Sequence, residues 1–376
     1  SSSVLWSSSG SSGTLSSTTA LNPVYTPSAA DTAAHGVTLR LIAYGNGPCN
    51  PDTSWVNITI NPEPLAFAGF DERICETSTL PVSTSTAAGV QTLQWTSSGS
   101  GGFDNSAILR PVYTPSAADI TAGNVTLTLT VNGFPQCSNV NDAATLRITR
   151  QPVASAGGND QICQNTTFTV SAATSIYDSL LQWSHNGTGG LSGATTLTPT
   201  YTPGAAEAGT VTLTMNVTPR VPCAALAPAM QLRIDPLPTA TINPATGQIC
   251  QGNPYVFAPG VASATANTVP AWTETGAGVL TNANTFTPTY NPAGGETGAV
   301  DMTMTVNGLL ECASETATAF FRLTLDPEPT ADAGSDATIC AGDNHQLNGN
   351  ATSYRLLLWT TSGTGGFNNA NLLNPI

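Results

Sequence analysis

The sequence predicts an all-β chain made of tandem copies of one small domain. A tryptophan recurs in steps of 87 to 89 residues, and strands alternate apolar residues with threonine. No segment of useful length has the 3.6-residue apolar period of an amphipathic helix. The recurring tryptophans are Trp6, Trp95, Trp183, Trp272 and Trp359.

Two further landmarks keep the same order and period. A tyrosine follows each of the first four tryptophans (Tyr25, Tyr113, Tyr201 and Tyr290), and an Ile-Cys pair recurs at Cys75, Cys163, Cys250 and Cys340. With the proline-rich joints as boundaries, we predict whole repeats at 63–150, 151–236 and 237–327. Residues 1–62 are then the back part of one repeat and 328–376 the front part of another. We interpret the chain as a window on a longer periodic protein.

The alternating segments predict strands with one buried and one solvated face. One such strand lies at Val125–Val131, with counterparts at Val211–Val217 and Met302–Val306. A second one closes each repeat, at Val56–Ile60, Ala144–Ile148, Met230–Ile234 and Phe321–Leu325. A repeat of 86 to 91 residues with several such strands has the size of an immunoglobulin-like β-sandwich.

Each recurring tryptophan ends a short apolar strand and precedes a Gly/Ser turn, as at Trp95 and Trp183. In a sandwich this is the third strand, whose tryptophan lies between the two sheets. A platform that stacks on sugars is the alternative interpretation. An aromatic residue that recurs once per domain inside an apolar strand favours the core, so we expect all five tryptophans to be core residues.

The acids that follow the tyrosines are predicted to cap a helical turn. Ser116 and Asp119 match the Ser-x-x-acid capping box, as do Ser28 and Asp31. Glu207 and Glu296 occupy the same place in later repeats. Because capping explains these acids, we expect no metal and no cofactor. Asp71, Asp160 and Asp336 also recur, but no Asp-x-Asp-x-Asp array accompanies them.

The composition bounds the function. Charged residues make up 9% of the chain, and 9 Lys+Arg against 23 Asp+Glu give a net charge of −14. This balance argues against nucleic acid and against anionic membrane surfaces. No run of 18 apolar residues predicts membrane insertion in this segment. No phosphate loop, His-Glu-x-x-His or Gly-x-Ser-x-Gly motif is present, so we expect no enzyme.

The eight cysteines form two classes, and we expect them to be oxidised in an extracellular setting. The strand cysteines (Cys75, Cys163, Cys250 and Cys340) follow the first strands, and the hairpin cysteines (Cys49, Cys137, Cys223 and Cys312) lie near the final hairpin turn. In an immunoglobulin-like topology the two classes lie at opposite poles of a repeat. This favours bonds between neighbours, Cys75–Cys223 and Cys163–Cys312, with partners of the other four outside the window. Bonds within a repeat, such as Cys75–Cys137, stay open as the alternative.

The segment from Ala331 to Cys340, the Leu-x-Trp strand, the Tyr-Thr-Pro motif and the Val-Thr-Leu-Thr strand resemble a known repeat type. It is the PKD-like or immunoglobulin-like repeat of giant cell-surface and secreted proteins of Bacteroidota, including gliding-type adhesins exported by type IX secretion. The resemblance implies extracellular display, adhesion or filament formation. The Trp-Asp-Phe-Gly-Asp-Gly signature of ordinary PKD domains is absent, and Gln94-Trp95-Thr96-Ser97 stands in its place.

Two functions of different classes follow. In the first, the repeats form a semi-rigid stalk or filament shaft at the cell surface, because alternating prolines in the joints keep the backbone extended. Its partners are the neighbouring repeats and, in a homo-oligomer or filament, sister chains packed on uncharged Ser/Thr/Ala faces. In the second, each repeat is a glycan- or surface-binding module that acts by multivalency. The sequence favours the structural function, because exposed aromatic residues do not recur in register on its loops.

Overall fold

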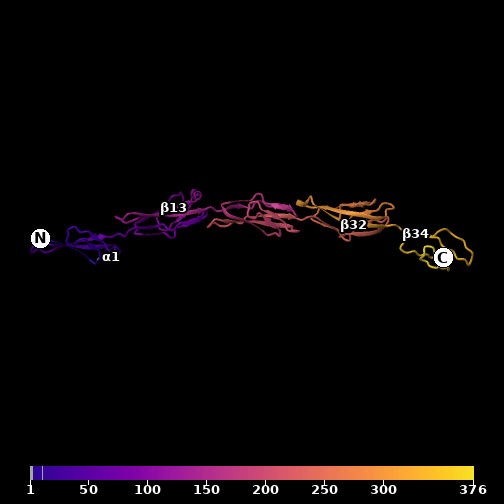
Figure 1. Cartoon of the computed structure of the whole chain (residues 1–376), viewed down its shortest axis with the longest axis horizontal. Coiled ribbons are helices and arrows are strands. Elements are labelled where there is room, and N and C mark those ends of the chain that lie inside the picture. The colour runs from indigo at the N-terminus through magenta and orange to yellow at the C-terminus, as the bar shows by residue number, and fades with distance from the viewer. Residues whose placement is uncertain (1–2, 11) are drawn as a thin grey trace. The chain divides into compact units, whose positions relative to one another are not determined.

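The computed structural model describes residues 3–10 and 12–376 and is almost entirely β (Figure 1). The chain forms two compact units. One consists of Ser1–Ser155, Thr174–Gln182 and Met215–Pro228, and the other of Ala156–Ala173, Trp183–Thr214 and Ala229–Ile376. The predicted repeat boundaries stay a prediction, and we use them to name segments.

Residues 63–150 form a complete two-sheet sandwich. One sheet has the order β10-β13-β14-β7 and the other β11-β12-β8, with a separate β6-β9 pair. The strands are β6 (Leu65–Phe67), β7 (Glu72–Cys75), β8 (Leu80–Pro81), β9 (Thr86–Ala88), β10 (Thr92–Ser97), β11 (Gly102–Phe103), β12 (Val112–Thr114), β13 (Asn124–Asn132) and β14 (Val140–Thr149), and the helix is α2 (Ala117–Ala122).

Residues 237–327 repeat this topology. Their sheets have the orders β25-β32-β31-β28 and β26-β30-β29, with a β24-β27 pair. The elements are β24 (Thr239–Ile242), β25 (Thr246–Cys250), β26 (Tyr255–Val256), β27 (Ala262–Thr265), β28 (Ala271–Glu274), β29 (Val279–Thr281), β30 (Thr289–Asn291), β31 (Gly298–Asn307), the 3-10 helix η1 (Leu310–Cys312) and β32 (Thr316–Asp326).

Residues 151–236 carry the same strands in the same order. In this segment β16 pairs parallel with β23, and β23 pairs antiparallel with β22. The strands are β15 (Val153–Ser155), β16 (Asp160–Cys163), β17 (Phe168–Thr169), β18 (Thr174–Ile176), β19 (Asp178–His185), β20 (Gly190–Ser192), β21 (Thr200–Thr202), β22 (Gly209–Pro219) and β23 (Ala229–Asp235).

The two outer segments contain fewer elements. Residues 1–62 contain β1 (Ser3–Ser8), β2 (Thr14–Leu15), β3 (Tyr25–Thr26), α1 (Ala29–Ala33), β4 (Gly36–Tyr44) and β5 (Asp52–Thr59). Residues 328–376 contain β33 (Thr330–Asp332) and β34 (Asn350–Thr352).

The predicted immunoglobulin-like, all-β fold class is confirmed. In β13, the residues Val125, Leu127, Leu129 and Val131 are buried between the sheets, and the intervening polar side chains are less buried. The last two long strands pair as an antiparallel hairpin, for example Leu127 opposite Ala144. Alternation works as a signal here because side chains along a strand point to opposite faces. The helices α1 and α2 are single capped turns, as expected, whereas the equivalent segments before Gly209 and Gly298 form hydrogen-bonded turns without a helix.

One pairing bears directly on the joints. The first long-sheet strand, β7, lies parallel to the last strand, β14, with Cys75 opposite Thr149. In 237–327, β25 lies parallel to β32 with Cys250 opposite Asp326. Each strand cysteine therefore lies at the end of its repeat from which the chain leaves for the next one.

Candidate functional site: the joints between repeats

The strand and hairpin cysteines of one repeat lie at opposite ends of its sheet. Cys75 is opposite the last residue of β14, whereas Cys137 precedes the first residue of the same strand. At about 3.3 Å per strand residue, roughly 40 Å separate the two sites. A disulfide requires Cα atoms within about 7 Å of each other. The register of β7 therefore places Cys75 too far from Cys137 for a disulfide bond in this fold.

In the structure, each bonded strand cysteine is joined to the hairpin cysteine of the following repeat. Cys75 is bonded to Cys223, with Cα atoms 4.9 Å apart, and Cys163 to Cys312, with Cα atoms 4.8 Å apart. The first bond lies within one compact unit and the second within the other. Within the described residues, Cys49, Cys137, Cys250 and Cys340 have no disulfide partner.

The first joint (residues 149–153) links repeats 63–150 and 151–236 and is held by Gln151. Its amide Nε2 donates to the Ala224 carbonyl (2.9 Å), and its Oε1 accepts from the Ala224 N–H (3.3 Å). The Gln151 backbone N–H donates to Glu76 Oε1 (3.0 Å). Gln151 therefore binds the repeat before it and the final hairpin of the repeat after it.

The second joint (residues 235–239) links repeats 151–236 and 237–327 and is built around Asp235, which is 4% exposed. Arg233 donates to both carboxylate oxygens, at 2.8 and 3.2 Å. The Glu311 N–H in the final hairpin of the next repeat donates to Oδ2 (3.2 Å). A buried carboxylate is tolerated only when paired and hydrogen-bonded, so Asp235 depends on contacts from both sides of the joint.

A recurring pair of hydrogen bonds ties each joint to its preceding strand. The residue after a strand cysteine donates its N–H to the end of the last strand and accepts, through its side-chain oxygen, the N–H two residues further along. The three sets are Glu76 with Thr149 and Gln151, Gln164 with Asp235 and Leu237, and Gln251 with Asp326 and Glu328. These residues were not among those predicted from the sequence. The available signal was the Glu or Gln that follows three of the four Ile-Cys pairs, with Ala341 as the exception.

A second recurring cluster explains the tyrosine and acid landmarks. In 63–150 the Asp119 carboxylate accepts from the Tyr113 hydroxyl (2.8 Å), the Ser116 N–H (2.9 Å), and the N–H groups of Ser100 and Gly101 (2.9 and 2.8 Å). The predicted capping boxes of α1 and α2 are confirmed. A Cβ at Gly101 would lie 2.6 Å from Asp119 Oδ2, which explains the glycine in this turn.

The environment of this cluster shifts the pKa values of its carboxyl group and its tyrosine. Burial acts to raise the pKa of Asp119, but hydrogen bonds from Ser116, Ser100 and Tyr113 outweigh it and hold the pKa below its usual value. Burial, together with the hydrogen bond to Glu296, raises the pKa of Tyr290 to about 12. The group is thus a charged carboxylate beside a neutral tyrosine, an arrangement that stabilises the fold.

Three recurring tryptophans are buried and two are half-buried. Trp95 and Trp183 are 2% exposed and Trp272 is 6% exposed. Trp6 and Trp359 are partly covered, because their segments contain fewer strands to pack on them. In all five, the indole N–H donates to a backbone carbonyl 13 or 14 residues further along. The three buried indoles present no face on which a sugar ring could stack.

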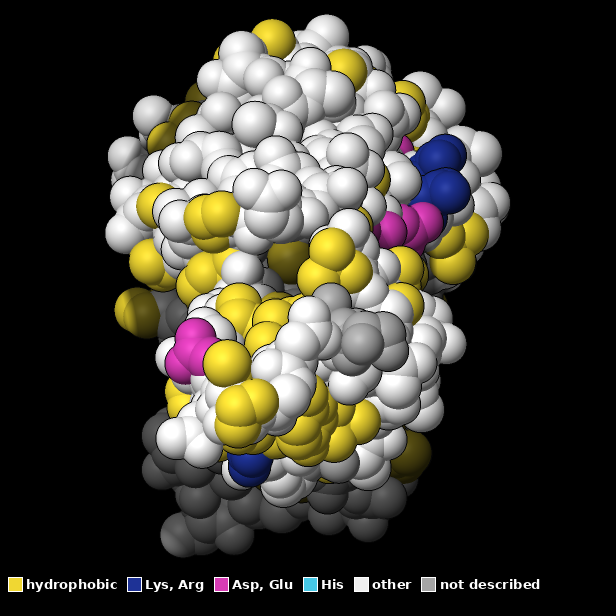
Figure 2. Space-filling model, turned by 90° about the vertical axis from the view of Figure 1, so that its left-hand side faces the viewer, with side chains coloured by type: hydrophobic (Ala, Val, Ile, Leu, Met, Phe, Trp, Pro, Cys, Tyr) yellow, Lys and Arg dark blue, Asp and Glu magenta, His cyan; other side chains and the backbone are white. Residues whose placement is uncertain are grey.

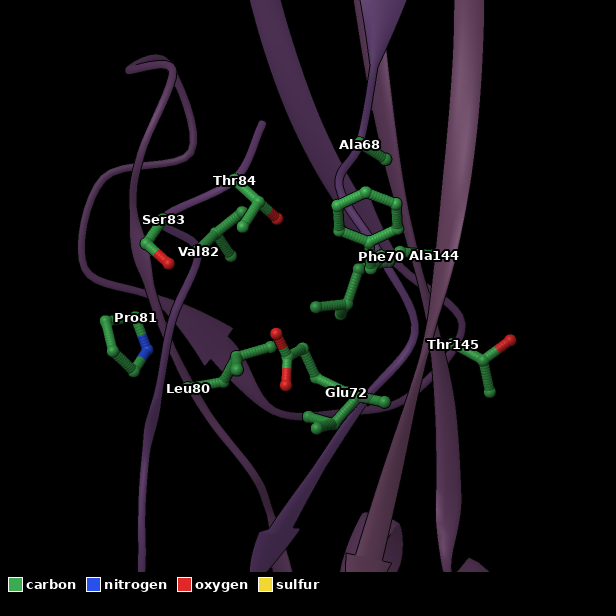
Figure 3. A pocket seen from close by; sticks show the side chains of 12 residues that line it. Ala68, Phe70, Glu72, Leu80, Pro81, Val82, Ser83, Thr84, Ala144 and Thr145 are labelled. Atoms are coloured by element: carbon green, nitrogen blue, oxygen red, sulfur yellow. The ribbon is translucent and has the colours of Figure 1, made fainter. Parts of the chain in front are cut away.

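The cavities are small or shallow. The cavity in Figure 3 lies between Phe70, Leu80 and Val82, and its volume of about 20 Å³ suits one water molecule. A wider hollow at the first joint is lined by Arg73, Arg150 and Arg220. At the second joint the equivalent positions, counted from the bonded cysteines and from the end of the last strand, are not arginines but Gln161, Pro236 and Leu309.

Neither a metal site nor a membrane span is found in the part of the chain that the structure covers. No group of three His, Cys, Asp or Glu side chains that could hold a metal occurs among its described residues. Asp71 Oδ1 instead accepts the Thr145 N–H (2.8 Å). No helix in the described ranges is long and apolar enough to cross a membrane. On the face shown in Figure 2, charged side chains are few and most of the surface is uncharged.

Comparisons with known proteins found similarity among solved structures only. No protein-family model matches the chain, and no curated protein matches it. Three consecutive I-band domains of titin are 10% identical, with 71% of this chain and 99% of that chain covered and a TM-score of 0.43. Three extracellular repeats of mouse cadherin-23 are 12% identical (71% and 99% covered, TM-score 0.37), and four cadherin domains of protocadherin gamma B2 are 13% identical (86% and 92% covered, TM-score 0.33). All three are similar to this chain as strings of β-sandwich domains.

Proposed function

We propose that this chain is a structural segment of a large extracellular adhesin or filament, in which disulfide-stapled joints keep a stalk semi-rigid. The observation that carries the proposal is the joint itself. At both joints between whole repeats, a disulfide and a side-chain hydrogen bond connect the end of one sandwich to the final hairpin of the next; the hydrogen bonds are Gln151 to Ala224 and Glu311 to Asp235. Such cross-links oppose bending and twisting about an otherwise single-stranded connection.

Disulfides between folded domains persist in oxidising environments, which supports an extracellular or cell-surface location. We also propose that the chain is exported by a type IX system and displayed on a Bacteroidota cell, on the ground of the sequence resemblance. The low charge supports lateral packing of sister chains into a filament, because little charge must be desolvated at such an interface.

The alternative of multivalent glycan binding has less support. The recurring tryptophans of the whole repeats are buried, and the three arginines that line the hollow at the first joint have no arginine counterparts at the second. Multivalency requires the same site in each copy.

The test measures the bend angle between neighbouring repeats by electron microscopy of single particles. Replacing both cysteines of the first staple (Cys75→Ser with Cys223→Ser) is expected to broaden the distribution of angles at that joint. The matched control is Cys49→Ser, which removes a cysteine that is unbonded in the described chain. An unchanged distribution in the double variant would refute a stiffening role. Sedimentation of the wild-type chain separates the two structural forms, because a filament sediments as large, concentration-dependent species and a single-chain stalk does not.

A further inference from the structure

The two disulfides interleave along the chain. Cys163 lies between Cys75 and Cys223, and Cys223 lies between Cys163 and Cys312. Every peptide bond from Cys75 to Cys312 therefore lies inside at least one disulfide-closed loop. The joints are included, because the first lies inside the Cys75–Cys223 loop and the second inside the Cys163–Cys312 loop.

Bonds within a repeat would give a different network. Cys75–Cys137 and Cys163–Cys223 loops would each enclose part of one sandwich and would leave the joints outside. A single cut at a joint would then separate the chain into two pieces. Joints and hairpin tips are the places where a folded array is most accessible to proteases, because little packing protects their backbone.

We propose that the interleaved disulfides make the array doubly connected, so that it stays one covalent, load-bearing molecule after a single backbone cut anywhere between Cys75 and Cys312. The same network limits how far the array extends under tension. This inference rests on the load-bearing function proposed above. It adds that the array tolerates a single backbone cut and has a fixed maximum length under tension.

The limit on extension follows from the shortest covalent path between Cys75 and Cys312. Without disulfides, about 240 residues join Cys75 to Cys312 and would extend to roughly 830 Å when unfolded. With both disulfides, the route runs from Cys75 to Cys223, back through about 60 residues to Cys163, and then to Cys312, which allows only roughly 210 Å. The maximum length between Cys75 and Cys312 in the bonded chain is therefore about a quarter of that in a chain without disulfides.

The test inserts one site-specific protease sequence into the full chain and compares denaturing gels with and without reductant. One variant carries the site after Asn139, which lies only in the Cys75–Cys223 loop. A second carries it after Ala227, which lies only in the Cys163–Cys312 loop. A third carries it after Asn344, outside both. All three positions are exposed. We expect the first two cut chains to run as one species until reductant is added, and the third to separate in either condition.

Single cysteine variants make the assignment specific. Cys75→Ser is expected to let the chain cut after Asn139 separate without reductant and to leave the chain cut after Ala227 joined, and Cys163→Ser should do the reverse. Separation of the cut wild-type chains without reductant would overturn the inference, as would variants that do not show this reciprocity. Denaturing gels do not require the serine variants to keep their full stability.

The two proposals fail in different ways. If the gels show the doubly connected network but the bend angles do not respond to loss of the staple, the stiffening role fails and the network stands. If the cut chains separate, the network fails whatever the bend angles show.

Discussion

Replacement of Tyr290 by phenylalanine tests the buried tyrosine–carboxylate cluster directly. The Tyr290 hydroxyl donates to Glu296 Oε1 (2.7 Å) and accepts the Gly278 N–H (3.0 Å), and the side chain is 0% exposed. Tyr290→Phe removes both bonds without changing the packed ring. A bond to a charged group contributes about 1.5–3 kcal/mol and a neutral bond about 1 kcal/mol, so we expect a loss of about 2–4 kcal/mol for this repeat.

The assay is native-state hydrogen exchange of the β31 amides in the full chain, because a single unfolding midpoint is not defined for several domains. A loss of 2–4 kcal/mol corresponds to roughly 30- to 700-fold faster exchange. The matched control is Tyr255→Phe in the same repeat, whose hydroxyl has a pKa raised by burial alone. Its effect should be several-fold smaller.

The loss of stability of this repeat at alkaline pH gives a second test of the cluster. Because the folded pKa of Tyr290 is raised to about 12, its contribution is fully present below the unfolded pKa near 10 and is lost as the pH rises through the folded value. In the phenylalanine variant this part of the pH dependence should vanish. Less than threefold faster exchange in Tyr290→Phe, or an equal effect in Tyr255→Phe, would refute the reasoning.

Two further predictions concern other parts of the same chain. Because the pKa of Asp119 is lowered in the fold, its contribution is present above the unfolded value near 4 and is lost as the pH falls through the folded value, so acid unfolding of repeat 63–150 should be steeper than in Asp119→Asn. The same pH dependence of hydrogen exchange at the β13 amides in both proteins would contradict this. Gln164→Ala removes the acceptor of the Leu237 N–H, and that amide should exchange about fivefold faster, for a loss of about 1 kcal/mol. Gln161→Ala, an exposed change on β16 three residues earlier, should leave Leu237 unaffected, and equal effects would argue against a joint-specific role.

The fold was predictable because its strongest signals are local. The alternation from Val125 to Val131 sets which side chains face the core, and the period of the tryptophans sets the repeat. The parallel pairing of β7 with β14 was not predictable in the same way, because backbone groups make it and no side-chain pattern specifies a partner.

The candidate site was predictable in part. The sequence separated the strand cysteines from the hairpin cysteines but left two pairings open, because residue spacing gives no distance. The register that places Cys75 opposite Thr149 supplies that distance. The roles of Glu76 and Gln151 were missed, since each depends on a contact about 75 residues away in sequence.

The interleaved disulfides impose an order on biogenesis. In an unfolded chain, the bond from Cys75 to Cys137 closes a loop of about 60 residues and the bond to Cys223 one of about 150, so the nearer partner is favoured by about 0.8 kcal/mol in closure entropy. Random oxidation would therefore trap the wrong pairs. The native pair forms only after two successive sandwiches have folded and docked, so each oxidation event reports that the preceding repeats are complete.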